Sequence, residues 1–317
     1  MALKQSRFIR QLKPQNIRWL FYLAIVLAIA AWRFLPRPWH PTLTVETAHY
    51  KIYSTATEEQ TSHTGRALEI LYLAYSNRMA KLKGWQAEHP RLQVKLFKDR
   101  AEMRWINPGM DWAEAFYQEP FCRAYYSDGE INPYHWMLHE SVHQLNHEVA
   151  HIAPAKWLEE GLAEYFSTCQ LTSNGLAMDI IDLNTYPVWW MDEIASSSNL
   201  VENIRNGSVI PLRAIITGKG GPAMNQNVNL YYLHWWTLTR FIFENKKYHD
   251  HALALVERSG TLDAFEDLIG PVDQVQNEWH DYVRQLKVEL KAEDRAHYKN
   301  RKVPKPFETP APLRTNL

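Results

Sequence analysis

The sequence predicts a mixed α+β protein: a membrane helix, then a small α/β lobe, then a mainly helical domain. Three observations carry this prediction. A basic leader precedes an uncharged apolar run, the stretch 42–97 alternates between strand-like and helix-like patterns, and most patterned segments after residue 130 repeat at helical spacing. With 46% hydrophobic and 22% charged residues, the chain has the composition of a globular protein.

Charge and residue counts exclude several classes of protein. The 317 residues include 35 Lys and Arg against 35 Asp and Glu, so the basic surplus that argues for nucleic acid as a partner is missing. A negative mean hydropathy excludes a polytopic membrane protein. Two cysteines are too few for a disulfide framework or a four-cysteine zinc site, whereas 14 histidines direct attention to other metal sites.

The amino-terminal segment predicts a transmembrane signal anchor at residues 19–35. Residues 1–18 form a basic leader without a single acid, and residues 19–32 carry no charge. With its flanks, this run spans about 27 Å as a helix, close to the thickness of a hydrocarbon core. Trp19 and Trp32 stand at its ends, where interfacial aromatic residues are common, and the excess of positive charge before the run places the amino terminus in the cytoplasm.

This orientation makes the chain a single-pass protein of the cell (inner) membrane with an extracytoplasmic body. The alternative is a signal peptide cleaved near Ala30, where small residues stand at the spacing that signal peptidases require, and the body is then secreted. Both interpretations place the body outside the cytoplasm.

The segment after the anchor predicts a small α/β lobe over residues 42–114. Residues 36–41 are proline-rich and predict a stiff linker, after which 42–55 alternates apolar and polar residues as a half-buried strand does. Thr57 opens a helical stretch, and 91–97 returns to strand-like alternation. The succession of strand, helix and strand defines the lobe.

The remaining elements predict a mainly helical domain over residues 115–302. After a strand at 121–126, Asn132 and Pro133 predict the N-cap and the first residue of a helix that ends before Pro154. Further segments at helical spacing are 154–166, 230–243, 248–258 and 271–292. The proline-rich residues 303–317 predict a disordered tail.

A His-Glu-x-x-His motif, His139-Glu140-Ser141-Val142-His143, lies on the first of these helices. Residues four apart on a helix differ by about 40° in direction, so both imidazoles reach one Zn²⁺ ion at about 2.0–2.1 Å. Glu140 faces a water on the same ion and can take its proton. The competing interpretation is a polar helix face striped with histidine, because five histidines recur every four residues from His135 to His151.

The following helix offers a third ligand. Glu160 precedes Gly161, and the missing side chain there allows the two helices to approach closely. Glu164 lies one turn further on the same face, where a carboxylate accepts a hydrogen bond from the outer nitrogen of a ligating histidine. Glu159 points elsewhere, into solvent.

The motif and the later segment WLEEGLAEYF, residues 157–166, resemble the gluzincin zinc metallopeptidases, and within them the peptidase MA-like group. The resemblance covers about residues 115–290 and implies a zincin-like fold with one Zn²⁺ per chain. It implies that Glu160 is the third zinc ligand and Glu140 the catalytic base. The metzincin pattern is excluded because Asn146 and Val149 stand where it has glycine and histidine.

Gluzincins of this kind often use a tyrosine from a later helix to stabilise the oxyanion. The segment 231–236 resembles that helix, and Tyr232 aligns best. Tyr231 and His234 remain alternatives for this role, and packing in the core is the competing interpretation of both tyrosines.

The sequence therefore predicts an extracytoplasmic zinc metallopeptidase whose partner is a peptide or protein substrate. One alternative is a catalytically inactive zincin-fold scaffold that binds cell-envelope partners, and another is a purely structural zinc. Three smaller questions stay open. Residues 186–191 form either a substrate subsite or a core contact, Cys122 and Cys169 form either a disulfide or two buried thiols, and the strand at 121–126 is a candidate for pairing with an extended peptide.

Overall fold

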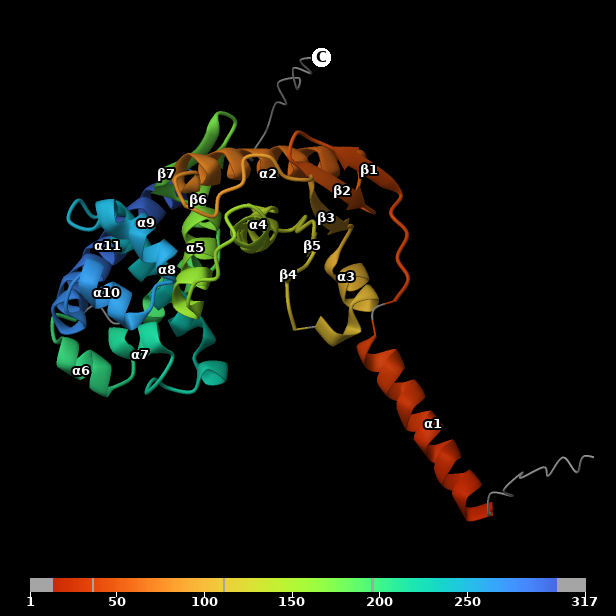
Figure 1. Cartoon of the computed structure of the whole chain (residues 1–317). Coiled ribbons are helices and arrows are strands. Elements are labelled where there is room, and N and C mark those ends of the chain that lie inside the picture. Colours follow the sequence, from red (N-terminus) through yellow and green to blue (C-terminus); the bar gives the residue numbers. More distant parts are fainter. Residues whose placement is uncertain (1–13, 36, 111, 195–196, 301–317) are drawn as a thin grey trace, which may run out of the picture.

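The computed structural model describes residues 14–300 except residues 36, 111, 195 and 196. Most of the predicted basic leader and the whole predicted tail, 303–317, lie outside the described residues. Mixed α+β architecture is confirmed: a five-stranded sheet stands beside a larger set of helices (Figure 1).

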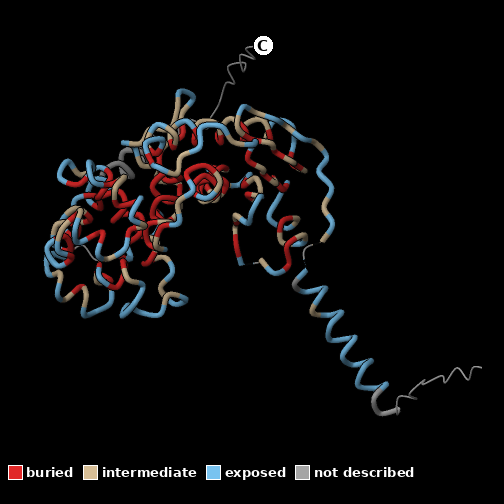
Figure 2. The backbone as a smooth tube through the Cα atoms, viewed as in Figure 1, coloured by how far each residue is buried: buried red, intermediate tan, exposed pale blue. Residues whose placement is uncertain are grey.

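A helix is present where the anchor was predicted: α1, Pro14–Phe34, projects away from the body of the protein (Figure 1). Most of this helix is coloured as exposed in Figure 2, and its exposed residues include large apolar ones such as Trp19 and Trp32. Within residues 14–300, apart from the gaps, no helix combines the length and the apolar character needed to cross a membrane. The carboxyl end of α1 meets the body where Arg33 Nη1 donates to the carbonyl of Pro108, 2.5 Å away.

The sheet has the strand order β1-β2-β3-β5-β4. Its strands are β1 (Leu43–Glu46), β2 (Tyr50–Ser54), β3 (Leu92–Phe97), β4 (Ala115–Gln118) and β5 (Phe121–Tyr125). The three central strands β2, β3 and β5 are parallel, and the two outer strands are antiparallel to their neighbours. The edge position predicted for a peptide-pairing strand is therefore held by β4, because β5 is paired on both sides.

The prediction of one strand over 42–55 is wrong, because β1 and β2 form a hairpin that turns at 47–49. Glu69 holds this turn: its Oε1 accepts both the Thr47 hydroxyl and the His49 amide, at 2.5 and 2.8 Å. Glu69 lies on α2 (Glu58–Met79), whose N-cap is Thr57, in a capping box closed by Gln60. The turn thus depends on a partner that is distant in the sequence.

The sheet crosses the predicted boundary between residues 114 and 115, because β4 and β5 belong to the same sheet as β1–β3. The buried side chains also form one continuous cluster, which runs from Tyr50 on β2 to Leu290 near the carboxyl end. Between β3 and β4 the chain adds two elements that the sequence analysis did not predict, α3 (Arg100–Ile106) and η1 (Pro108–Met110).

Three helices carry the candidate site. These are α4 (His135–Glu148), α5 (Lys156–Ser167) and α8 (Val228–Glu244). Helix α4 packs on β4 and β5, and α5 lies between α4 and α8, so α5 joins the sheet side to the helical side (Figure 1). The remaining elements are β6 (Cys169–Thr172), β7 (Gly175–Ile181), η2 (Val188–Glu193), α6 (Leu200–Arg205), α7 (Leu212–Thr217), η3 (Met224–Gln226), η4 (His249–His251), α9 (Ala252–Glu257), α10 (Leu262–Leu268) and α11 (Val272–Asn300).

Helix α4 begins two residues later than predicted, at His135 rather than Pro133. Asn132 does not cap it. Its side-chain oxygen instead accepts the amide of Tyr134, and its side-chain nitrogen donates to Asp182 Oδ2 at 2.9 Å. The side chain therefore ties the turn before α4 to the loop after β7, and the helix starts at His135.

The two cysteines are buried free thiols, so the disulfide alternative is wrong. Cys122 on β5 contacts Met137 and Ser141 on α4, whereas Cys169 Sγ donates to the carbonyl of Tyr165, 3.0 Å away. Burial raises the pKa of the Cys169 thiol to about 12, and both thiols act as small apolar side chains of the core.

Candidate metal centre

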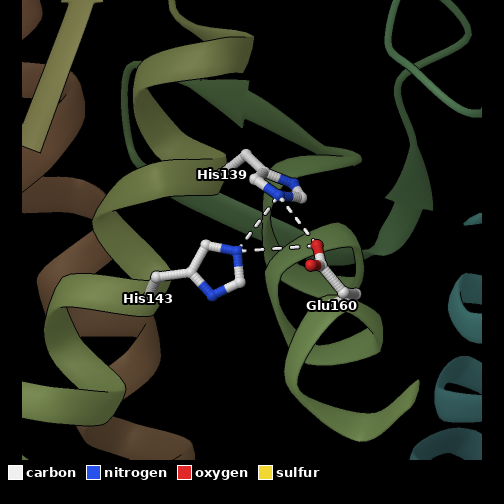
Figure 3. Close-up of side chains that lie close together, drawn as sticks. All are labelled: His139, His143 and Glu160. Carbon is white, nitrogen blue, oxygen red and sulfur yellow. Dashed lines mark hydrogen bonds and ion pairs between the residues drawn. The ribbon is translucent and has the colours of Figure 1, made fainter. Parts of the chain in front are cut away.

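His139 and His143 project from one face of α4 because they are separated by a single helical turn (Figure 3). An adjacent face of this helix is held in the core by Leu138, Val142 and Leu145, each completely buried. This packing fixes the direction of the two imidazoles before any ligand binds.

Glu160 on α5 points at the two imidazoles from the neighbouring helix (Figure 3). The two histidine Nε2 atoms are 3.2 Å apart, and Glu160 Oε2 lies 3.5 Å from that of His139 and 3.7 Å from that of His143. Atoms bound to one ion in tetrahedral geometry at about 2.0–2.1 Å are separated by about 3.3 Å. These three donor atoms are therefore spaced as ligands of a single metal ion.

The same distances define a common binding point. A triangle with these three edges has a circumradius of about 2.0 Å, so one point lies at zinc-ligand distance from all three atoms. Glu160 Oε2 is also buried, and its contacts with the two imidazole nitrogens, at 3.5 and 3.7 Å, are too long for hydrogen bonds, which is costly for a carboxylate oxygen. A cation at this point would satisfy it. The residues present fit a bound metal ion.

Both outer imidazole nitrogens face a carboxylate. His139 Nδ1 lies 3.1 Å from Glu164 Oε1, and the Glu164 side chain is 1% exposed. His143 Nδ1 lies 3.7 Å from Glu159 Oε1, on a side chain that is 44% exposed. The prediction for Glu164 agrees with this geometry, whereas Glu159 does not point away from the site as expected. Carboxylates in these positions fix the tautomer and direction of ligating imidazoles.

Without a metal, protons compensate the charge of this cluster. Burial disfavours the charged form of His139, but Glu164 and Glu160 outweigh it and raise its pKa well above the ordinary value. Burial opposes the charged form of His143 too, yet Glu159 and Glu160 raise its pKa to about 9. Burial by itself raises the pKa of Glu160, and its contacts with both imidazoles lower it below the ordinary range. A metal ion that binds here must displace protons.

Glu140 follows His139 on α4 and is directed toward β4. Its Oε2 accepts the backbone amide of Tyr117, at 2.7 Å, and the residue is partly exposed. Its negative charge also contributes to the raised pKa of His139, His143 and Tyr232. The carboxylate thus lies between the cluster and the edge strand of the sheet.

Of the three oxyanion candidates, Tyr232 lies beside the cluster. Its ring centroid is 6.3 Å from that of His139, and burial, with Glu160 and Glu164, raises its pKa far above the ordinary value. The phenol therefore remains a hydrogen-bond donor at neutral pH. Tyr231 turns away and donates to the carbonyl of Pro222 at 2.9 Å.

His234 is a core residue. Its Nδ1 donates to the carbonyl of Leu230 at 2.7 Å, and its Nε2 accepts the amide of Ile210 at 2.9 Å. Both ring nitrogens are occupied, and burial lowers its pKa to about 4, so the ring is neutral. It is unable to donate to a substrate.

The four-residue repeat of histidines divides into different environments. His135 is completely buried, its Nδ1 is 3.5 Å from the Ser167 carbonyl, and burial lowers its pKa to about 3. His147 is exposed and contacts the Tyr117 hydroxyl at 3.2 Å. In the part of the chain that the structure describes, the group able to hold a metal ion is His139, His143 and Glu160. The histidines that recur every four residues therefore do not form one uniform, solvent-exposed helix face.

Sequence reasoning missed two residues near the cluster. Glu159 reaches His143 because α5 packs against α4, a contact between helices that no local pattern specifies. Tyr186 lies 5.3 Å from Tyr232 between ring centroids, and Glu164 and Glu160 add to the rise in its pKa that burial causes. Its position in an aromatic segment was a signal, but that signal did not separate a subsite from a core contact.

No protein-family model matches the chain, and neither does any curated protein.

Proposed function

We propose that this protein is a zinc-dependent peptidase with a gluzincin-like, zincin-type catalytic domain. The observation that carries the proposal is a cluster of three protein ligands, rather than four, within the described residues. Structural zinc sites are closed by four protein ligands, whereas catalytic sites have three and leave one position for water or substrate. This comparison favours catalysis over a structural zinc.

Zinc suits these donors better than Mg²⁺ or Ca²⁺ does. Two imidazole nitrogens and one carboxylate oxygen form a mixed set that zinc accepts in tetrahedral geometry, whereas Mg²⁺ and Ca²⁺ require oxygen ligands. Glu159 and Glu164 behind the imidazoles add negative charge, which increases the attraction for a dication.

The roles that we propose for the other residues follow from their placement. When bound, zinc would supply a Lewis acid that lowers the pKa of a water and polarises a carbonyl. Glu140 would accept a proton from the attacking water and deliver it to the leaving amine. The phenol of Tyr232 would donate a hydrogen bond to the negative charge that develops on the carbonyl oxygen.

The edge strand β4 supports a peptide as the substrate. One side of β4 pairs with β5, and strands at a sheet edge offer backbone groups to an extended partner. The Tyr117 amide on this strand contacts Glu140, so a peptide bound along β4 would run beside the proposed base.

We further propose that α1, whose apolar side chains are exposed, attaches the chain to a membrane with an extracytoplasmic body.

The experiment is a comparison of the full chain with its Glu140→Gln variant. Zinc content is measured by atomic emission, and cleavage is followed with a mixture of blocked peptides by mass spectrometry. The wild type should bind one zinc per chain and cleave, whereas the variant should keep the zinc and lose at least a hundredfold in rate. Zinc without turnover in the wild type would favour the non-catalytic scaffold, and His143→Ala with full zinc content would refute the metal site.

A further inference from the structure

A continuous run of aromatic side chains leads outward from the candidate metal centre. Tyr232 is 6.3 Å from His139 between ring centroids, and Tyr186 is 5.3 Å from Tyr232. Trp136 follows at 5.6 Å from Tyr186, and Trp189 at 6.4 Å from Trp136. We call these four residues, Trp136, Tyr186, Trp189 and Tyr232, the aromatic ledge. They come from α4, from the segment 186–189 at the start of η2, and from α8.

The exposure of the ledge distinguishes it from the core. The core tryptophans Trp157, Trp236 and Trp279 are less than 2% exposed, whereas Trp189 is 47% exposed and Trp136 and Tyr186 are only partly buried. Contiguous aromatic surface in water is unfavourable, and where it adjoins a reactive site it marks a surface that a ligand covers. The interpretation of residues 186–191 as a pure core contact is therefore incomplete.

Hydrogen bonds at the polar ends of two rings hold the ledge in place. The Tyr186 hydroxyl donates to Asn229 Oδ1 at 3.3 Å, and Trp136 Nε1 donates to Glu130 Oε1 at 3.4 Å. With their polar atoms satisfied, these rings are left with apolar faces and edges for contact. Such rings bind another ring in offset or edge-to-face geometry without a new polar partner.

The negative charge at the inner end of the aromatic ledge limits which substrate side chains can bind there. His139, whose ring centroid is 6.3 Å from that of Tyr232, lies 3.5 Å from a Glu160 oxygen and 3.1 Å from a Glu164 oxygen, so two carboxylates stand at the inner end of the ledge. An acidic side chain placed there would be repelled. A large neutral apolar side chain would replace water on the rings at no electrostatic cost.

We propose that the aromatic ledge binds a large apolar, preferably aromatic, side chain of the peptide substrate next to the scissile bond. This specificity rests on the proposed peptidase function, since it assigns a substrate class to the same site. Phenylalanine at this position should exceed alanine by about tenfold to a hundredfold in kcat/KM, the range that such contacts give in apolar subsites. Glutamate should be the poorest residue.

The first test uses blocked nonapeptides that differ only at the residue beside the cleaved bond, with Phe, Leu, Ala or Glu there. Full-length wild type is compared with Trp189→Ala and Trp136→Ala, and Val201→Ala on α6, 78% exposed, is the control. Each Trp variant should reduce the preference for Phe over Ala to about threefold or less, mainly because the Phe peptide is cleaved more slowly. The control should retain the preference.

The second test separates this proposal from the proposed function. Zinc-loaded Glu140→Gln is titrated with fluorescein-labelled Phe and Ala peptides, and binding is read by anisotropy. Tighter binding of the Phe peptide, lost on adding Trp189→Ala, supports the ledge even if the wild type cleaves nothing. Equal binding of both peptides, or a preference that survives both Trp substitutions, overturns it. A change from dimer to monomer in Trp189→Ala by light scattering, with selectivity unchanged, would overturn it as well, because the ledge would then be a contact between chains.

Discussion

The carboxylates behind the two imidazoles allow a quantitative test of the metal site. Glu164→Gln and Glu159→Gln make the same chemical change, because each replaces a carboxylate by an amide of nearly the same shape. The environments differ: Glu164 is 1% exposed and 3.1 Å from His139 Nδ1, whereas Glu159 is 44% exposed and 3.7 Å from His143 Nδ1. A comparison of the two variants therefore isolates how the burial of a carboxylate affects zinc binding by the imidazole that it contacts.

The expected magnitudes follow from this difference. A buried charge-assisted hydrogen bond contributes about 1–2 kcal/mol more than a neutral one, so Glu164→Gln should weaken zinc binding by about fivefold to thirtyfold. An exposed, longer pair contributes about 0–1 kcal/mol, so Glu159→Gln should weaken it by no more than about fivefold. The amide should not unfold the protein, because burial already raises the pKa of Glu164 and disfavours its charge.

The assay is competition for zinc against a chromophoric chelator at a fixed pH of 7.5, with circular dichroism and thermal melting of the metal-free proteins as controls for folding. Equal effects of the two substitutions, or a larger effect of Glu159→Gln, would refute the reasoning from burial. No effect of either substitution would refute the assignment of these carboxylates to the support of ligating imidazoles.

Three other predictions concern single residues. In Gly161→Ala the new Cβ would meet Thr239 Oγ1 at 2.1 Å and the Trp235 carbonyl at 2.7 Å, so α5 must shift away from α8. Chemical denaturation should show that the free energy of unfolding falls by about 1–3 kcal/mol. A variant as stable as the wild type would disprove the close packing. Tyr232→Phe should lower kcat by about a hundredfold with KM nearly constant, which steady-state kinetics would test. The pKa of His234 is about 4 in the folded protein, below its unfolded value, so this residue contributes stability that is complete above pH 6.5 and is lost as the pH falls toward 4. Urea titrations of the metal-free protein should show a loss of up to about 3 kcal/mol in the free energy of unfolding over this range. The loss should be smaller in His234→Gln.

Local patterns in the sequence were sufficient to select the three residues that could hold a metal ion. The four-residue spacing of His139 and His143 determines their common face on α4, and Glu160 follows on the next helix. Capping at Thr57 likewise places the start of α2 correctly. Each of these features is set within one or two helical turns, which is the range over which sequence spacing fixes geometry.

Features that depend on packing between distant elements were not predictable. Gly161 was expected to bring α5 close to α4, yet its missing side chain admits Thr239 and the Trp235 carbonyl of α8. The turn between β1 and β2 requires Glu69 from α2, and the edge of the sheet is β4 because β5 inserts between β3 and β4. In each case two segments must already be in place before the role of the residue is defined.

The position of Glu160 on a different helix from the two histidines has a thermodynamic consequence. An ion shared by α4 and α5 would close a loop of 17 residue steps, from His143 to Glu160, and would cross-link the sheet side of the protein to its helical side. Because the unfolded chain has no such preformed site, the free energy of ion binding becomes free energy of folding. Each tenfold rise in free ion concentration above the dissociation constant adds about 1.4 kcal/mol to the native state. The melting temperature would then report on the metal supply of the compartment in which the protein resides.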